Sequence, residues 1–192
     1  AANITFNSDG TKLYAVGFFN DSVIQYNLST GFDLSTASAS GNSFSVAAQN
    51  GSPRAILFSF DGTKMFIVGI SGSANVYQYT LPTAFDITTA SYSGVSFSVN
   101  GQEGTALGLS FSVDGTKMYV VGFDNNTVYQ YNLSTGFDLS TASYSSVSFS
   151  VGGQDTLPID VTFNFSGTKM YILGTTGDAV YQYSTGTSAA LD

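Results

Sequence analysis

The chain contains 192 residues with a formal net charge of −8, and 43% of its residues are hydrophobic while only 9% are charged. It contains no cysteine and no histidine, which excludes disulfides, thiolate metal sites, cysteine nucleophiles and Ser-His-Asp triads. The acidic balance disfavours nucleic acid and anionic membrane surfaces as partners, and no apolar run is long enough for membrane insertion.

A repeat of about 52 residues organises the whole chain. The turn motif Asp-Gly-Thr-Lys begins at Asp9, Asp61 and Asp114, and it returns as Ser-Gly-Thr-Lys at Ser166. A Gln-Tyr pair follows each turn motif, at residues 25–26, 78–79, 130–131 and 182–183. Two series with the same spacing indicate four copies of one unit, with approximate bounds 1–52, 53–105, 106–157 and 158–192.

Turn signals divide each unit into predicted strands. In the second unit we expect strands at 55–60, 64–69, 75–80 and 95–99. The first three strands are apolar on both faces and require cover on both sides, whereas the fourth alternates between apolar residues and serine, as a half-exposed strand does. We place the three prolines, at positions 53, 82 and 158, in loops, and no segment has the periodicity of a long helix.

These features predict an all-β fold, a β-propeller of four-stranded antiparallel blades. The fourth unit ends soon after its third strand, so we expect the last blade to lack its outer strand. The chain is then a single propeller domain over residues 1–192 or a section of a larger propeller. The sequence allows three ways in which the ring of blades closes: as part of a larger ring, as a ring made by two chains, or as a four-bladed ring with a three-stranded last blade. Because the chain begins at Ala1 without methionine, we expect a processed chain or a piece of a longer protein.

The repeat resembles a known class of sequences. The motif Asp-Gly-Thr-Lys-Met-Tyr-Val-Val-Gly, followed by Val-Tyr-Gln-Tyr and Phe-Asp-Leu-Ser-Thr-Ala-Ser, is best developed at residues 111–122 and 128–143. It resembles β-propeller repeats of bacterial surface proteins and phage structural proteins, and it is loosely similar to the YVTN-type propeller repeat. The resemblance implies blade architecture together with binding or scaffolding roles at a cell or virion surface.

Comparison among the copies separates structural residues from candidate site residues. The repeated turn aspartates and the Phe-Asp pairs at 32–33, 85–86 and 137–138 are expected to serve the fold. Residues that differ between copies fall mainly in the second turn of a unit and in the connection to the next unit, which emerge at one end of an antiparallel blade. We therefore predict a ligand-binding end, with sequence drift in exposed loops as the alternative explanation. The predicted residues are Phe18, Phe19, Asp21, Arg54, Glu103, Phe123, Asp124, Asp155, Asp160 and Asp178.

The predicted function is non-catalytic recognition or scaffolding, so we expect no enzyme activity, no catalytic residue and no cofactor. The partner would be a glycan or surface protein, other domains of a larger parent protein, or a second copy, and the location secreted, cell-surface or virion-surface. The alternatives are a structural spacer or self-assembling subunit, and a carbohydrate-active enzyme that uses acidic residues such as Asp160 and Glu103. Asp124 and Asn126 offer oxygen ligands for calcium, but no EF-hand loop is present, so no metal site is predicted.

Overall fold

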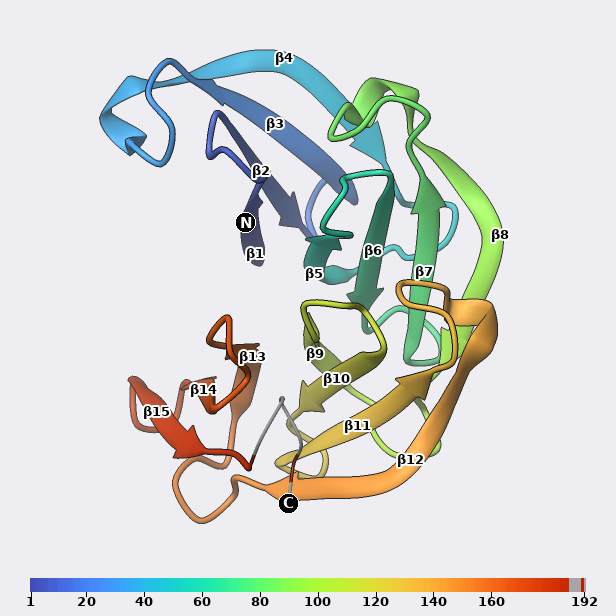
Figure 1. Ribbon diagram of the computed structural model, residues 1–192, viewed down its shortest axis with the longest axis vertical. Coiled ribbons are helices and arrows are strands. Elements are labelled where there is room, and N and C mark those ends of the chain that lie inside the picture. Colours follow the sequence, from blue (N-terminus) through green and yellow to red (C-terminus); the bar gives the residue numbers. More distant parts are fainter. Residues whose placement is uncertain (187–190, 192) are drawn as a thin grey trace. The chain divides into compact units, whose positions relative to one another are not determined.

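The regular structure of the chain is almost entirely β-strand (Figure 1). The computed structural model describes residues 1–186 and residue 191. Within that part, strands that are consecutive in sequence pair antiparallel and form four separate sheets, which we call blades 1 to 4 in chain order. No helix in the described part of the chain is long and apolar enough to span a membrane.

The strands of the blades have the following bounds. Blade 1 contains β1 (Asn3–Phe6), β2 (Lys12–Gly17), β3 (Ser22–Leu28) and β4 (Ala37–Ser45). Blade 2 contains β5 (Pro53–Phe58), β6 (Lys64–Gly69), β7 (Asn75–Thr80) and β8 (Ser91–Ser98). Blade 3 contains β9 (Ala106–Phe111), β10 (Lys117–Gly122), β11 (Thr127–Leu133) and β12 (Ala142–Ser150). Blade 4 contains β13 (Pro158–Phe163), β14 (Lys169–Gly174) and β15 (Ala179–Ser184).

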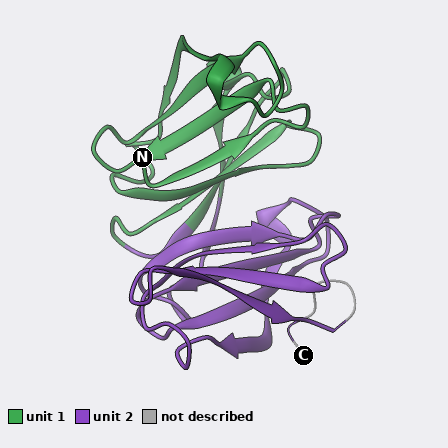
Figure 2. Ribbon diagram, turned by 90° about the vertical axis from the view of Figure 1, so that its left-hand side faces the viewer, with its two compact units in different colours: residues 1–72, 76–95 green, residues 73–75, 96–192 purple. Residues whose placement is uncertain are grey.

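The chain divides into two compact units, residues 1–72 with 76–95 (unit 1) and residues 73–75 with 96–192 (unit 2) (Figure 2). In each unit one blade packs face to face on the next blade. The buried contact in unit 1 contains Tyr14, Val16, Val23, Ile56, Met65 and Ile67. The contact in unit 2 contains Tyr119, Val121, Val128, Val161, Met170 and Ile172. Small antiparallel sheets that cover one another's apolar faces in this way are propeller blades, which confirms the predicted all-β β-propeller fold.

The turn between the first two strands of blades 1 to 3 is stabilised by the turn aspartate, as predicted from the sequence. One carboxylate oxygen of Asp9, Asp61 and Asp114 accepts a hydrogen bond from the backbone N–H two residues later, at 2.9 to 3.0 Å. In blade 4 the hydroxyl of Ser166 lies 2.9 Å from the hydroxyl of Thr168 instead. The position therefore requires an oxygen acceptor near the turn and does not require a charge.

The loop before each outer strand is built around a phenylalanine and an aspartate. Asp33, Asp86 and Asp138 cap the short 3-10 helices η1 (Leu34–Thr36), η2 (Ile87–Thr89) and η3 (Leu139–Thr141) by accepting a backbone N–H two residues later. The preceding phenylalanine has a positive φ, and its ring lies over the glycine of the turn between the first two strands of the same blade.

Substitution of Gly115 tests this packing. Gly115 has a φ of +71°, and a Cβ atom there would overlap the ring of Phe137. Gly115→Ala is therefore expected to lower the free energy of unfolding by about 1–3 kcal/mol, because backbone strain and overpacking add. Gly153→Ala is the matched control, since no atom lies within 4 Å of its added Cβ. Equal denaturation midpoints for the two variants would contradict this account.

Two sequence predictions about strand bounds need correction. The outer strands begin earlier than expected, since β8 starts at Ser91, and register shifts in the pairing of β3 with β4 and of β11 with β12 mark bulges. A bulge interrupts the alternation of apolar and polar residues. The sequence pattern therefore predicts only the part of each outer strand that lies after the bulge. Pro53 and Pro158 begin β5 and β13 instead of lying in loops, because the first residue of a strand tolerates a missing N–H donor.

Blade 4 has three strands in the part of the chain that the structure describes, in agreement with the predicted lack of an outer strand. The prediction also concerns the end of the chain, where residues 187–190 and 192 lie outside the described residues. Leu191 is described, and its buried side chain belongs to the core of unit 2.

Candidate functional site

The predicted site residues lie at one end of their blades or in a first strand. Phe18, Phe19 and Asp21 lie in the turn between β2 and β3, Phe123 and Asp124 in the turn between β10 and β11, and Asp178 in the turn between β14 and β15. Glu103 and Asp155 lie in the connections that precede β9 and β13, and Arg54 and Asp160 lie in the first strands β5 and β13. Arg54 and the residues of the β2–β3 turn belong to unit 1, and the others belong to unit 2.

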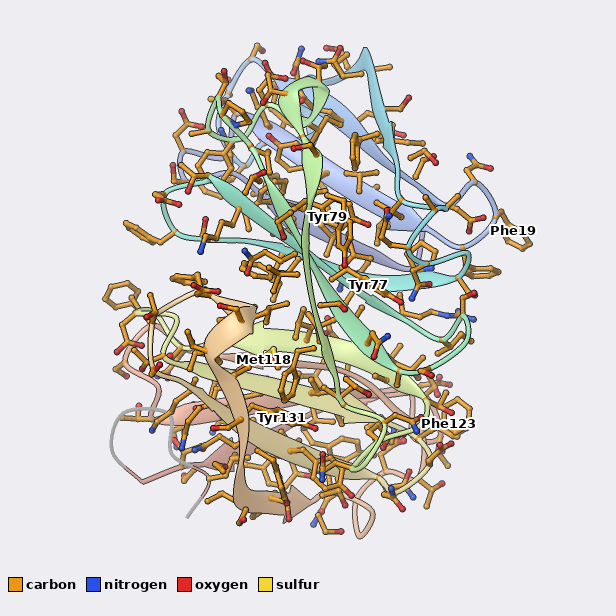
Figure 3. All side chains as sticks on the ribbon, turned by 90° about the vertical axis from the view of Figure 1, so that its right-hand side faces the viewer. Phe19, Tyr77, Tyr79, Met118, Phe123 and Tyr131 are labelled. Atoms are coloured by element: carbon orange, nitrogen blue, oxygen red, sulfur yellow. The ribbon has the colours of Figure 1, made fainter. Side chains whose placement is uncertain are left out.

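In unit 1 the structure brings Arg54 and Phe18 together. The guanidinium carbon of Arg54 lies 4.3 Å from the ring centroid of Phe18, which is a cation–π distance. The ring of Phe18 in turn lies 4.3 Å from that of Phe19, which extends into solvent (Figure 3). The Nε atom of Arg54 is buried and has no hydrogen-bond partner. This cluster therefore combines a partly desolvated cation with an exposed aromatic ring.

Asp21 and Asp178 have a role in the backbone of their turns. Asp21, Asn126 and Asp178 have φ values of 45°, 49° and 47°, in the left-handed region. Asparagine and aspartate tolerate this conformation better than other residues with a side chain. The turn geometry is therefore a sufficient reason for these residue types at these positions.

Glu103 and Asp155 share a buried position with Asn50. The side-chain oxygen of each residue accepts the backbone N–H two residues later: Asn50 that of Ser52 at 2.9 Å, Glu103 that of Thr105 at 3.0 Å, and Asp155 that of Leu157 at 2.8 Å. Glu103 and Asp155 are predicted from the sequence as residues that differ between copies, and that prediction does not include Asn50. The available signal was that each of the three follows a repeated glutamine, at positions 49, 102 and 154.

The pKa values of the two carboxyl groups at this position are shifted in opposite directions. Burial raises the pKa of Glu103, and the negative charge of Asp124 adds to this effect against the hydrogen bonds from backbone amides. Burial also acts to raise the pKa of Asp155, but the backbone amides of Gly177, Leu157 and Thr176 outweigh it and hold the pKa below its ordinary value. The Oε2 atom of Glu103 is buried without a hydrogen-bond partner.

Asp124 lies directly beside this buried glutamic acid. Its backbone N–H donates to Glu103 Oε1 at 3.2 Å, and the side-chain amide of the next residue, Asn125, donates to the carbonyl of Gln102 at 2.8 Å. A Cβ built on Gly104 would lie 2.7 Å from Asp124 Oδ2, so the Asp124 carboxylate lies over the Glu103–Gly104 backbone. Asp124 itself is exposed, and Phe123 stands beside it at the outer edge of the turn (Figure 3).

The two neighbouring carboxyl groups differ in their access to solvent. That of Glu103 is buried and that of Asp124 is exposed, so Asp124 is the one of the two that a substrate can reach. Asp160 is not part of this pair of neighbouring carboxyl groups. It is half-buried in β13, and its Oδ1 accepts the N–H of Val161 at 2.9 Å.

The proposed calcium ligands are used differently. No group of three or more acidic side chains that could hold a metal occurs among the described residues. With its amide nitrogen placed toward its acceptors, the Asn126 side chain donates to the carbonyls of Phe123 at 3.1 Å and Thr156 at 2.7 Å. Asn126 therefore ties its turn to the connection before β13.

Comparison with known proteins finds relatives in structure only. No protein-family model and no curated protein matches the chain. A proposed 6-phosphogluconolactonase from Bacteroides uniformis matches 97% of this chain and 54% of its own length with a TM-score of 0.64 and 16% identity. A Pseudomonas aeruginosa periplasmic gluconolactonase matches 95% and 49% with a TM-score of 0.57 and 18% identity. The β-propeller domain of Myceliophteria thermophila Cps50 matches 96% and 54% with a TM-score of 0.61 and 12% identity.

These neighbours change the functional interpretation. The chain spans about half the length of each, and at these identities the likeness shows the β-propeller fold. Two of the three are named as lactonases, which contradicts our predictions of a non-catalytic recognition module and of a chain that is not an enzyme. Those predictions kept an enzyme that uses acidic residues only as an alternative, because the absence of histidine and cysteine excludes the commonest catalytic groups.

The contrast between Glu103 and Asp155 predicts opposite pH effects on stability. The ordinary pKa of glutamate is 4.5, and the folded state raises it for Glu103, so the contribution of Glu103 is greatest below that range and declines as the pH rises toward the folded value. The pKa of Asp155 is lowered from 3.8, so its contribution is present above that range and is lost as the pH falls.

Each effect is measured as the stability of the wild type minus that of a neutral variant. With Glu103→Gln we expect this difference to increase as the pH is lowered, and with Asp155→Asn we expect it to decrease. Urea denaturation at a series of pH values gives both differences. Slopes of the same sign would contradict the opposite pKa shifts of Glu103 and Asp155.

Proposed function

We propose that the chain is a hydrolase that opens the ring ester of a sugar lactone, with Asp124 as its general base. The observation that carries the proposal is the exposed carboxylate of Asp124 beside the buried Glu103, whose pKa is raised. The solved structures named as lactonases supply the substrate class.

The chemistry requires few groups. The Asp124 carboxylate takes a proton from a water molecule as the water oxygen attacks the lactone carbonyl carbon. The bond between that carbon and the ring oxygen then breaks, and the ring oxygen takes the proton from Asp124. One water is consumed and a hydroxy acid is formed, so Asp124 returns to its charged state. The chain contains no histidine, and a carboxylate is a general base that it can supply.

Other acidic side chains have structural roles. The aspartates of the turns and of the η-helices accept local hydrogen bonds, and those bonds lower the pKa of Asp9, Asp33, Asp61, Asp86 and Asp114. A lowered pKa makes a carboxylate a poorer base. Glu103 acts through Asp124, because its Oε1 accepts the N–H of Asp124, and we assign it as a positioning residue.

The name of one structural neighbour also bears on the location of the chain. We place it outside the cytoplasm, which the description of one neighbour as a periplasmic gluconolactonase supports. The predicted surface location on a cell or virion has no independent support.

The direct test is hydrolysis of gluconolactone and of 6-phosphogluconolactone by the purified 192-residue chain. Acid release, followed with a pH indicator, is expected to exceed the spontaneous rate in the same buffer for at least one of the two substrates. Rates equal to the spontaneous rate for both lactones would overturn the proposal.

A further inference from the structure

Each blade has two apolar faces with different partners. In unit 1 one face of blade 1, formed by Tyr14, Val16 and Val23, packs on blade 2. We call this the trailing face of a blade. The face of blade 2 that it meets includes Ile56, Met65 and Ile67, and we call this the leading face. The same pairing of a trailing face with a leading face occurs between blades 3 and 4 in unit 2.

The leading face of blade 1 is uncovered. Ile4 is 54% exposed, whereas Ile56 and Val161 at the same position are buried. Leu34 is 59% exposed, whereas Ile87 at the same position in blade 2 is fully buried in the contact with blade 1. Apolar side chains at these positions are buried where a preceding blade packs on them, so the exposure of Ile4 and Leu34 shows that no described blade covers the leading face of blade 1.

The trailing face of blade 4 is uncovered in the same sense. Val180 is 65% exposed, whereas Val23 and Val128 at the same position are fully buried. Leu173 is 40% exposed, whereas Val16 and Val121 at its position are fully buried. Among the residues that the structure describes, the chain therefore presents one open leading face and one open trailing face. These are the two halves of the contact that occurs within unit 1 and again within unit 2.

We propose that two copies of the chain associate, with the trailing face of blade 4 of each copy packed on the leading face of blade 1 of the other. A second copy is the partner because each open face matches, position by position, a face that is covered within the chain. Two copies of the chain together also have about the length of one lactonase structure, since a single copy covers 54% and 49% of the two. The apolar residues named on both faces are uncharged, and Lys169, at the position of Lys12, is expected to meet a backbone carbonyl as Lys12 does within unit 1.

The internal contact in unit 1 contains two hydrogen bonds to one backbone carbonyl. The hydroxyl of Tyr14 donates to the carbonyl of Phe85 at 2.5 Å, and the ammonium of Lys12 donates to the same carbonyl at 3.1 Å. Tyr171 occupies the position of Tyr14 in blade 4, and Phe32 occupies the position of Phe85 in blade 1. In the pair of chains, the Tyr171 hydroxyl of one copy is therefore expected to donate to the Phe32 carbonyl of the other.

Light scattering of the purified chain after gel filtration tests the proposal. We expect a mass twice the chain mass of 20.1 kDa at micromolar concentration. Leu34→Asp and Val180→Asp each place a charge on one open face and are expected to weaken association more than about tenfold, because a buried unpaired charge is costly. Val113→Asp is the matched control, since Val113 is also exposed but lies in the β9–β10 turn, outside both faces. Circular dichroism checks that all three variants are folded.

A mixture of the two disruptive variants shows which faces meet. Leu34→Asp alters only the leading face, and Val180→Asp alters only the trailing face. In a mixed pair, the intact trailing face of the first variant can therefore pack on the intact leading face of the second, and the mixture is expected to regain part of the association. No recovery on mixing would overturn the proposed contact between unlike faces. A wild-type mass of 20.1 kDa, or open chains larger than two copies, would also overturn it. None of these results depends on the lactonase assay.

Discussion

Replacement of Asp124 by asparagine is expected to lower kcat for lactone hydrolysis by about 10²- to 10⁴-fold, the range typical for loss of a general base. Asparagine keeps the size of the side chain and leaves the backbone N–H that donates to Glu103 Oε1 unchanged. The variant should therefore fold as the wild type does, and the loss should appear in kcat more than in KM.

The control is Asp33→Asn. It makes the same substitution at an exposed aspartate that caps η1, where asparagine also serves as a cap, so activity is expected to be unchanged. Glu103→Gln is expected to keep Asp124 in place and to alter the pH dependence of kcat without abolishing turnover. Wild-type kcat in Asp124→Asn would refute the assignment of Asp124 as the base, even if the chain hydrolyses lactones.

Truncation of Tyr131 is expected to have the largest effect on stability. Tyr131 is fully buried in unit 2, where its ring packs edge-on against Phe97 at 5.4 Å and near Tyr144 at 5.6 Å (Figure 3). Tyr131→Ala removes this ring and leaves a cavity, so we expect the free energy of unfolding to fall by about 3–5 kcal/mol. The measurement is the denaturation curve of each variant under one set of conditions.

Two further variants measure how much the Tyr131 hydroxyl and the neighbouring Tyr144 ring each contribute to stability. The Tyr131 hydroxyl donates to Gln102 Oε1 at 3.4 Å, so Tyr131→Phe is expected to cost only about 0.5–1.5 kcal/mol. Tyr144→Ala removes a ring that is already 36% exposed and should cost less than Tyr131→Ala. Equal losses for Tyr131→Phe and Tyr131→Ala would show that the ring does not contribute the stabilisation assigned to it.

The fold could be predicted from the sequence because it rests on local and repeated features. The Asp-Gly turns at Asp61 and Asp114 depend on hydrogen bonds between residues two apart, and such bonds are visible in any single copy. Strand types followed from side-chain patterns, and the copies supplied an internal check on each of them. Where the pattern breaks, as at the bulges of the outer strands, the predicted bounds were wrong.

The candidate site could be predicted only in part. The sequence placed Glu103 and Asp124 at the same end of their blades, because turns and connections emerge there together. It did not show that Asp124 donates its N–H to Glu103, since that contact joins residues 21 apart and depends on how the connection folds against the turn. It also did not show that Glu103 shares its position with Asn50, whose amide differs from it in length and charge.

By itself, therefore, the sequence determined the four-fold repeat, the antiparallel strands and the turn chemistry, because each depends on residues close together in the chain. Only the tertiary structure decided which carboxyl groups are buried and which apolar faces stay open. Those properties depend on the removal of water by neighbours distant in sequence. Identical motifs such as Val-Tyr-Gln-Tyr thus acquire different exposure at Val128 and at Val180.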